Sequence, residues 1–193
     1  MVSLYGGLGT LSSSGAVAIH TLDAGSSGVS GILKLSSGAA KGGRGRSLDL
    51  TVGSGNSGAG GDVGVLAGAT GAATGGSVTL YSGKGTMSSS GSFVIRTLDA
   101  GTKGVSGMLS LSSGAATSGS SGSIMIGTGE ASGGKGGMLH LTVGSGNNGA
   151  GGDAKMLAGE TSAETGGSLT LHAGIGSKST SGSVSLQTLS AGT

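Results

Sequence analysis

Apolar residues recur in this chain with a fixed period of fifteen, and this period constrains its fold more than any other feature. The chain divides into 15-residue repeats, except that the repeats 15–30 and 91–106 are one residue longer, and the third and fifth positions of every repeat are apolar. An incomplete repeat, 1–14, precedes the others. The repeats begin at Gly15, Gly31, Arg46, Gly61, Gly76, Gly91, Gly107, Gly122, Gly137, Gly152, Gly167 and Gly182.

Two pairs of longer matching segments support the same period. "HTLDAGSSGVSG" at 20–31 returns as "RTLDAGTKGVSG" at 96–107, and "TVGSGNSGAGGD" at 51–62 returns as "TVGSGNNGAGGD" at 142–153. The first offset is 76 and the second is 91, because the second copy contains one extra repeat at 122–136. We therefore expect a 91-residue higher-order cycle of six repeats along the chain.

The pattern within a repeat predicts a short β-strand. Positions three and five are apolar and position seven is small or β-branched, which is the alternation of a strand with one buried face. A strand this short cannot bury that face alone, but stacked repeats would bury it. We predict an all-β fold, a single β-solenoid (β-helix) over residues 1–193, with one 15-residue repeat per coil, about 13 coils and a thin core. Glycine would occupy corners that need positive φ, and Asn56 and Asn147 would lie in turns.

Composition argues against two alternatives to this fold. The chain has 48 Gly and no Pro, and the GxGxxG patterns at 53–58 and 144–149 could suggest phosphate-binding loops. Roughly three such patterns are expected by chance at this glycine content, and residues 59–75 are too rich in glycine to form the helix that a dinucleotide site needs. A disordered Gly/Ser linker is the second alternative, but linkers do not maintain two apolar columns through every repeat.

The chemically versatile side chains do not form a consistent constellation. The histidines His20, His140 and His172 fall on outward positions of coils that are not neighbours, whereas a metal site needs three or four converging ligands. We expect no metal site, no cofactor-binding residue and no catalytic residue, and therefore no enzyme. Lys34 and Asp49 fall on the same outward column of successive coils, and we expect a weak surface ion pair between them.

The remaining carboxylates give the same result. Asp62 and Asp153 stand in "GAGGD" segments that faintly resemble calcium-binding Gly-Asp repeats, but those repeats need an Asp in every turn. Glu160 and Glu164 share a repeat without a partner for acid–base chemistry. A corner carboxylate that binds backbone amides is the simpler interpretation of the aspartates.

Charge and hydropathy limit the partners. The formal net charge is +2 and basic residues are not clustered with aromatic ones, so we expect no nucleic-acid binding. No apolar run approaches the length of a membrane-spanning helix, and we expect no membrane span. The chain has no Cys, so a disulfide framework is excluded.

The segments "GSVTL-SG" and "TVGSGNSGAGGDV" resemble Gly/Ser/Ala-rich repeats in large uncharacterised proteins of diatoms and related algae. The resemblance covers essentially the whole chain and implies an extracellular or cell-surface fibrous protein, of which this chain would be a segment. We expect a structural or adhesive rod or filament segment, which associates with itself by head-to-tail stacking or continues in a longer chain. The alternative is a flat face that binds ice, carbohydrate or a mineral surface. Outward column four, with Thr79 and Thr170, is no regular threonine ladder, because Lys34 and Asp49 interrupt it. Column eleven, with Thr10 and Thr86, suits that face better because it is small and polar, although it is irregular.

Overall fold

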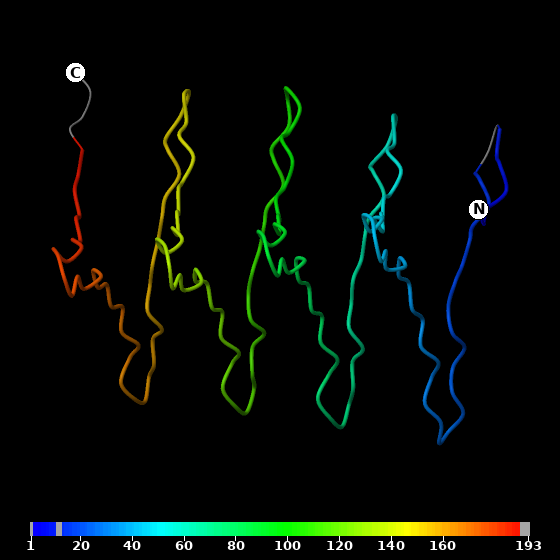
Figure 1. Cartoon of the computed structure of the whole chain (residues 1–193), viewed down its shortest axis with the longest axis horizontal. Coiled ribbons are helices and arrows are strands. Elements are labelled where there is room, and N and C mark those ends of the chain that lie inside the picture. Colours follow the sequence, from blue (N-terminus) through cyan, green and yellow to red (C-terminus); the bar gives the residue numbers. More distant parts are fainter. Residues whose placement is uncertain (1, 11–12, 190–193) are drawn as a thin grey trace. The chain divides into compact units, whose positions relative to one another are not determined.

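The computed structural model describes residues 2–10 and 13–189, and within them the backbone forms neither helices nor strands. The chain divides into two parts, Met1–Ile95 and Arg96–Thr193, which we call the N-terminal and C-terminal halves. In each half, extended segments alternate with narrow loops (Figure 1). The repeats of the sequence are therefore best described as a series of loops rather than as layers of a sheet.

The loops bend at the same place in successive repeats. In 15-residue repeats the bend occupies positions eleven to thirteen. Asn56 and Asn147 lie in such bends, near the predicted turns, but without the left-handed backbone that favours asparagine in turns. The two longer repeats instead have a turn at 26–27 and at 102–103, where the N–H of Gly28 or Gly104 donates to the carbonyl three residues earlier. The extra residue of these repeats is thus accommodated at the loop end. The bends lie at 41–43, 56–58, 71–73, 86–88, 117–119, 132–134, 147–149, 162–164 and 177–179.

Between the bends, the extended backbone places alternate side chains on opposite sides. Polar side chains two residues apart approach each other at positions two, four and six of several repeats. We call this side the polar face, and we call the side of positions three, five and seven the apolar face. The contacts join Ser47 Oγ to Asp49 Oδ2 at 2.9 Å, Thr142 Oγ1 to His140 Nε2 at 3.0 Å, Lys155 Nζ to Asp153 Oδ2 at 3.5 Å, and Gln187 Nε2 to Ser185 Oγ at 3.0 Å.

Five loops are closed at their base by one backbone hydrogen bond. The N–H of the glycine at position one donates to the carbonyl of the glycine at position eight of the preceding repeat, over 2.7–2.9 Å. We call this contact the loop neck. It joins Gly15 to Gly7, Gly76 to Gly68, Gly91 to Gly83, Gly167 to Gly159 and Gly182 to Gly174.

The predicted all-β solenoid is wrong. Stacked coils need hydrogen bonds between residues about one repeat apart, but every hydrogen bond among the described residues joins positions at most 10 apart. The predicted thin core is absent as well, since no side chain in the described ranges is buried. The physical reason is that the chain folds back in narrow loops, five of which are closed by a neck, rather than pairing along successive repeats. The ends of the predicted domain, Met1 and Thr193, lie outside the described residues.

The predicted reason for the glycines also needs correction. No glycine in the described part of the chain has positive φ, so left-handed corners do not explain them. Close approach explains several. A Cβ added at Gly176 would lie 2.8 Å from the carbonyl oxygen of Ser179, and one at Gly85 would lie 2.5 Å from that of Ser88. Where position ten is Thr instead, its hydroxyl accepts hydrogen bonds from bend amides, as Thr161 does from Ala163 and Glu164 at 3.3 Å.

These distances predict different effects for two glycines of one loop. Gly85→Ala places a methyl group against backbone oxygens at the bend 86–88, whereas a Cβ at Gly83 meets no atom within 4 Å. We expect Gly85→Ala to speed hydrogen exchange of the Gly91 amide by about two- to tenfold, the range for one net hydrogen bond. Gly83→Ala serves as the control and should leave that exchange unchanged. Equal exchange rates in the two variants would contradict the close approach at Gly85.

Candidate functional surface

The apolar face is the most regular chemical surface of the chain. At position three, the large side chains from Val17 onward expose 51–64% of their area, while large apolar side chains outside positions three, five and seven expose 72–99%. The position-seven residues Val52 and Val143 are less exposed still, at 43% and 46%. The residues predicted to form a core thus share one side of the backbone but remain open to solvent, since the large side chains at position five expose 55–83% of their area.

Contact between positions seven and one shapes the base of each loop. A Cβ added at Gly61 would lie 2.6 Å from Val52 Cγ1, and one at Gly152 would lie 2.7 Å from Val143 Cγ1. The same added atom at Gly137 would lie 3.2 Å from Thr128 Cβ. The position-seven side chain lies close to this space, so a side chain at position one would require it to shift in these repeats. Sequence reasoning missed this contact, although glycine at position one with a small or β-branched residue at position seven was its signal.

The size of the position-seven side chain correlates with closure of the neck. The neck hydrogen bond forms in the repeats with Gly or Ala there, and in one with Ser82. It does not form where the residue is Val or Thr, nor at Ser37 and Ser113. Ser37 Oγ instead donates to the carbonyl of Arg46 at 3.2 Å, and Thr21 Oγ1 donates to that of Gly31 at 3.3 Å. The closed necks follow Gly6, Ala67, Ser82, Ala158 and Ala173.

The polar face does not bring the chemically versatile residues together. His140 contacts Thr142, and no group of three or more potential metal ligands forms among the described residues. The side chains of His20, His172 and the carboxylates considered above are exposed. The expectation that the chain has no catalytic, cofactor or metal site stays a prediction.

The predicted ion pair between Lys34 and Asp49 is wrong. Asp49 accepts a hydrogen bond from Ser47 in its own repeat, and the single ion pair in the described ranges joins Lys155 to Asp153. The two residues of the predicted pair belong to successive repeats, and no ladder aligns those repeats. Ion pairs in such a chain form between positions two apart, where an extended backbone brings side chains to the same side.

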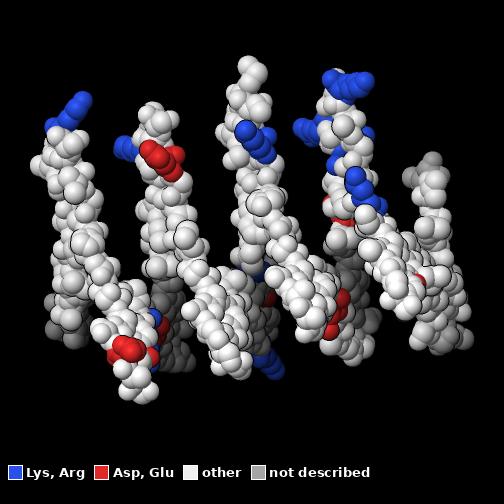
Figure 2. All heavy atoms as spheres, turned by 90° about the horizontal axis from the view of Figure 1, so that it is seen from below, with Lys and Arg blue, Asp and Glu red and all other residues white. Residues whose placement is uncertain are grey.

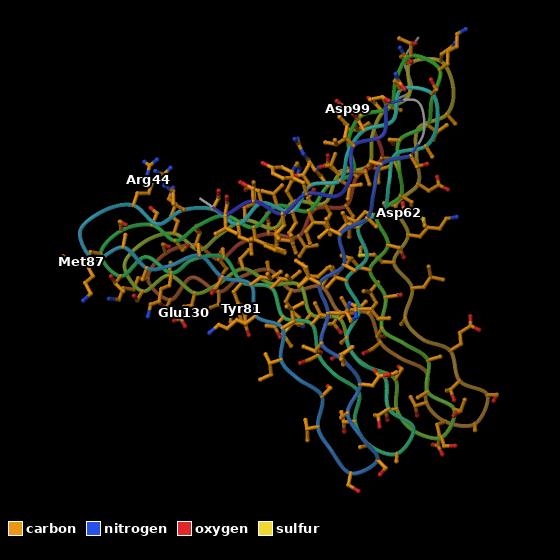
Figure 3. All side chains as sticks on the ribbon, turned by 90° about the vertical axis from the view of Figure 1, so that its right-hand side faces the viewer. Arg44, Asp62, Tyr81, Met87, Asp99 and Glu130 are labelled. Atoms are coloured by element: carbon orange, nitrogen blue, oxygen red, sulfur yellow. The ribbon has the colours of Figure 1, made fainter. Side chains whose placement is uncertain are left out.

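Charges are distributed unevenly along the repeat. Five of the six charged residues at positions eleven to fourteen, around the bends, are basic, and four of the five at position nine are acidic. Figure 2 shows basic side chains at the outer ends of loops, and Arg44 and Met87 extend outward at loop ends in Figure 3. The loop ends are therefore mainly cationic. The residues around the bends are Lys41, Arg44, Lys103, Lys135, Lys178 and Glu164, and those at position nine are Asp23, Lys84, Asp99, Glu130 and Glu160.

The surface contains no pocket among its described residues, and this part of the chain also lacks any helix that could cross a membrane. No protein-family model matches the chain, and no curated protein or solved structure matches it either. The candidate functional surface is therefore the exposed apolar face, together with the cationic loop ends.

The neck gives a direct test of local packing. Val52→Ala removes the methyl group nearest Gly61, and we expect the Gly61 amide to donate to the Gly53 carbonyl, as in the repeats with Ala at position seven. Exchange of the Gly61 amide should slow by about two- to tenfold. Val52→Thr keeps the branched side chain and is the matched control, with no slowing expected. If both variants leave Gly61 exchange unchanged, side-chain size does not control the neck.

Proposed function

We propose that this chain is a structural or adhesive fibrous segment that acts in an extracellular or cell-surface assembly. The partner in this proposal is the chain itself, joined to further copies or continued in a longer repeat protein. The resemblance to Gly/Ser/Ala-rich algal repeats supports the location outside the cell. No catalytic step is part of the proposal.

The exposed area is the observation that carries it. The accessible surface is 19,404 Å², about 2.5 times the roughly 7,900 Å² expected for a folded monomer of this mass. A fully unfolded chain of the same mass would expose roughly 25,000 Å². Repeats that bury so little within one chain would gain stability from contacts with other molecules. Fibrous assemblies supply such contacts along the whole length of a repeat protein.

The cationic loop ends support a second candidate, a surface binder for anionic mineral or carbohydrate. Basic side chains at exposed loop ends can contact a negatively charged surface without involving the apolar face. Such binding is electrostatic and weakens as salt increases. Ice binding, the other form of this candidate, has no support from charged loop ends, and thermal hysteresis measurements test it directly.

Electron microscopy over a concentration series tests the main proposal. We expect fibrous or branched assemblies to appear as concentration rises, and to persist in high salt because apolar contacts are not screened. Adsorption to silica or to an anionic polysaccharide, with loss in high salt, would favour the second candidate. A compact single particle with a radius of gyration of about 16 Å at all concentrations would contradict the fibrous proposal.

A further inference from the structure

We propose that the apolar face is the surface on which a second copy of this chain packs, and that the repeats become ordered when it does. This inference rests on the proposed function, since it names the surface through which the fibrous segment would associate. It differs from the head-to-tail stacking predicted from the sequence, because the contact runs along the repeats rather than through the ends of the chain.

Three consecutive residues in one repeat show that the apolar face is less exposed than the opposite side. Ile124 and Ile126, at positions three and five, expose 55% and 65% of their area, while Met125 between them exposes 93%. The two isoleucines thus share a sheltered side, and the methionine lies on the opposite one. The same alternation recurs at Phe93, Val94 and Ile95. A flat partner can contact every apolar position on this side of a repeat at once.

Contact between two apolar faces leaves room for further copies only when the copies are offset. A stable pair of proteins buries about 1,200–2,000 Å² in total, and the accessible surface of the whole chain exceeds that of a folded monomer by far more than this. A pair in full register closes, because each copy contributes the same surface and both faces are covered. A pair offset by some repeats leaves part of each face open to a third copy, so the fibrous proposal requires an offset contact.

A second copy fits this surface better than an unrelated partner because it has the same period. Apolar residues stand at positions three and five of repeats in both halves of the chain. Two copies can match these positions along their whole length, whereas another protein would need the same 15-residue spacing. The net charge of +2 is small, so repulsion between copies is weak.

Backbone N–H and C=O groups beside the apolar face need hydrogen-bond partners when a second molecule packs there. Few backbone groups of the described residues have partners within the chain. Packing on the apolar face removes water from the adjacent backbone, whose N–H and C=O groups then need new partners. An extended segment of a second copy offers donors and acceptors at the same spacing. A lipid surface or a mineral does not.

Two variants with equal charge test the inference. The face variant replaces Leu80, Ile95, Leu111 and Ile126, all at position five, with Asp. The control variant replaces four apolar residues outside the face, each 93–99% exposed, with Asp, so that both variants change the net charge equally. Each set has two substitutions in either half. The control residues are Leu66, Met87, Val105 and Met125.

Sedimentation velocity and backbone hydrogen exchange over a concentration series give the readouts. The unmodified chain and the control variant should associate as concentration rises, with slower exchange at positions two to seven. In the face variant, the concentration for half-association should rise at least about tenfold, because buried unpaired carboxylates oppose packing. Equal association of the two variants would overturn the inference. The inference would also be overturned if the unmodified chain stayed monomeric at every concentration, whether it was compact or exchanged its amide hydrogens rapidly.

The outcomes separate this inference from the proposed function. If both variants still form fibres, the apolar face is not the contact, but the fibrous function stands. If the unmodified chain forms small closed oligomers that only the face variant loses, the contact is right and the fibrous function is wrong. High salt gives a further check, because association through the apolar face should persist and adsorption through the cationic loop ends should not.

Discussion

The close approach at the loop neck is the contact on which the local structure depends. The first position of a repeat lies against the seventh and eighth positions of the repeat before it. In repeats such as the one that begins at Gly61, a side chain at the first position would displace that of Val52. Where position seven is Gly or Ala, the neck closes with a backbone hydrogen bond, as between Gly76 and Gly68. The five closed necks therefore satisfy part of the backbone within single loops. This leaves the apolar face without a covering layer from the next repeat.

The sequence allowed two of the bends to be predicted, but not the pairing of the segments between the bends. Asparagine indicated turns at Asn56 and Asn147, and the alternation placed Ile124 and Ile126 on one side of the backbone. A period shows where equivalent residues recur, but it does not show whether a segment pairs with the next repeat, with its own return or with another molecule. Loop-closure entropy hardly separates these options, since a doubling of loop length costs only about 0.6 kcal/mol. Specific contacts therefore determine which segments pair, and the contact of position one with position seven was not recognised in the sequence.

The absence of stacked coils also explains why other predictions from the sequence were wrong. Lys34 and Asp49 were expected to meet because coils were expected to stack. Without stacking, Asp49 instead accepts a hydrogen bond from Ser47 in its own repeat. Positive φ was expected at glycine corners because a tight solenoid needs such corners, whereas open bends do not. The candidate surface was partly predictable, because the columns at positions three and five are the residues of the apolar face. The solvent exposure of these residues was not predictable, because it depends on which segment packs against them. No residue type in the repeat specifies that segment.

In an assembly of this chain, the contact area and the register depend on different features of the repeat. If copies pack through the apolar face, as proposed above, a shift by one repeat brings equivalent side chains together again, so the face by itself selects no register. The loop ends differ between repeats. Those at 26–27 and 102–103 contain an extra residue and a hydrogen-bonded turn, and the second also carries Lys103. A shift by one repeat would place such a loop beside a shorter one with a different charge. The apolar face can thus supply contact area, while loop length and loop charge supply the differences from which a preferred register arises.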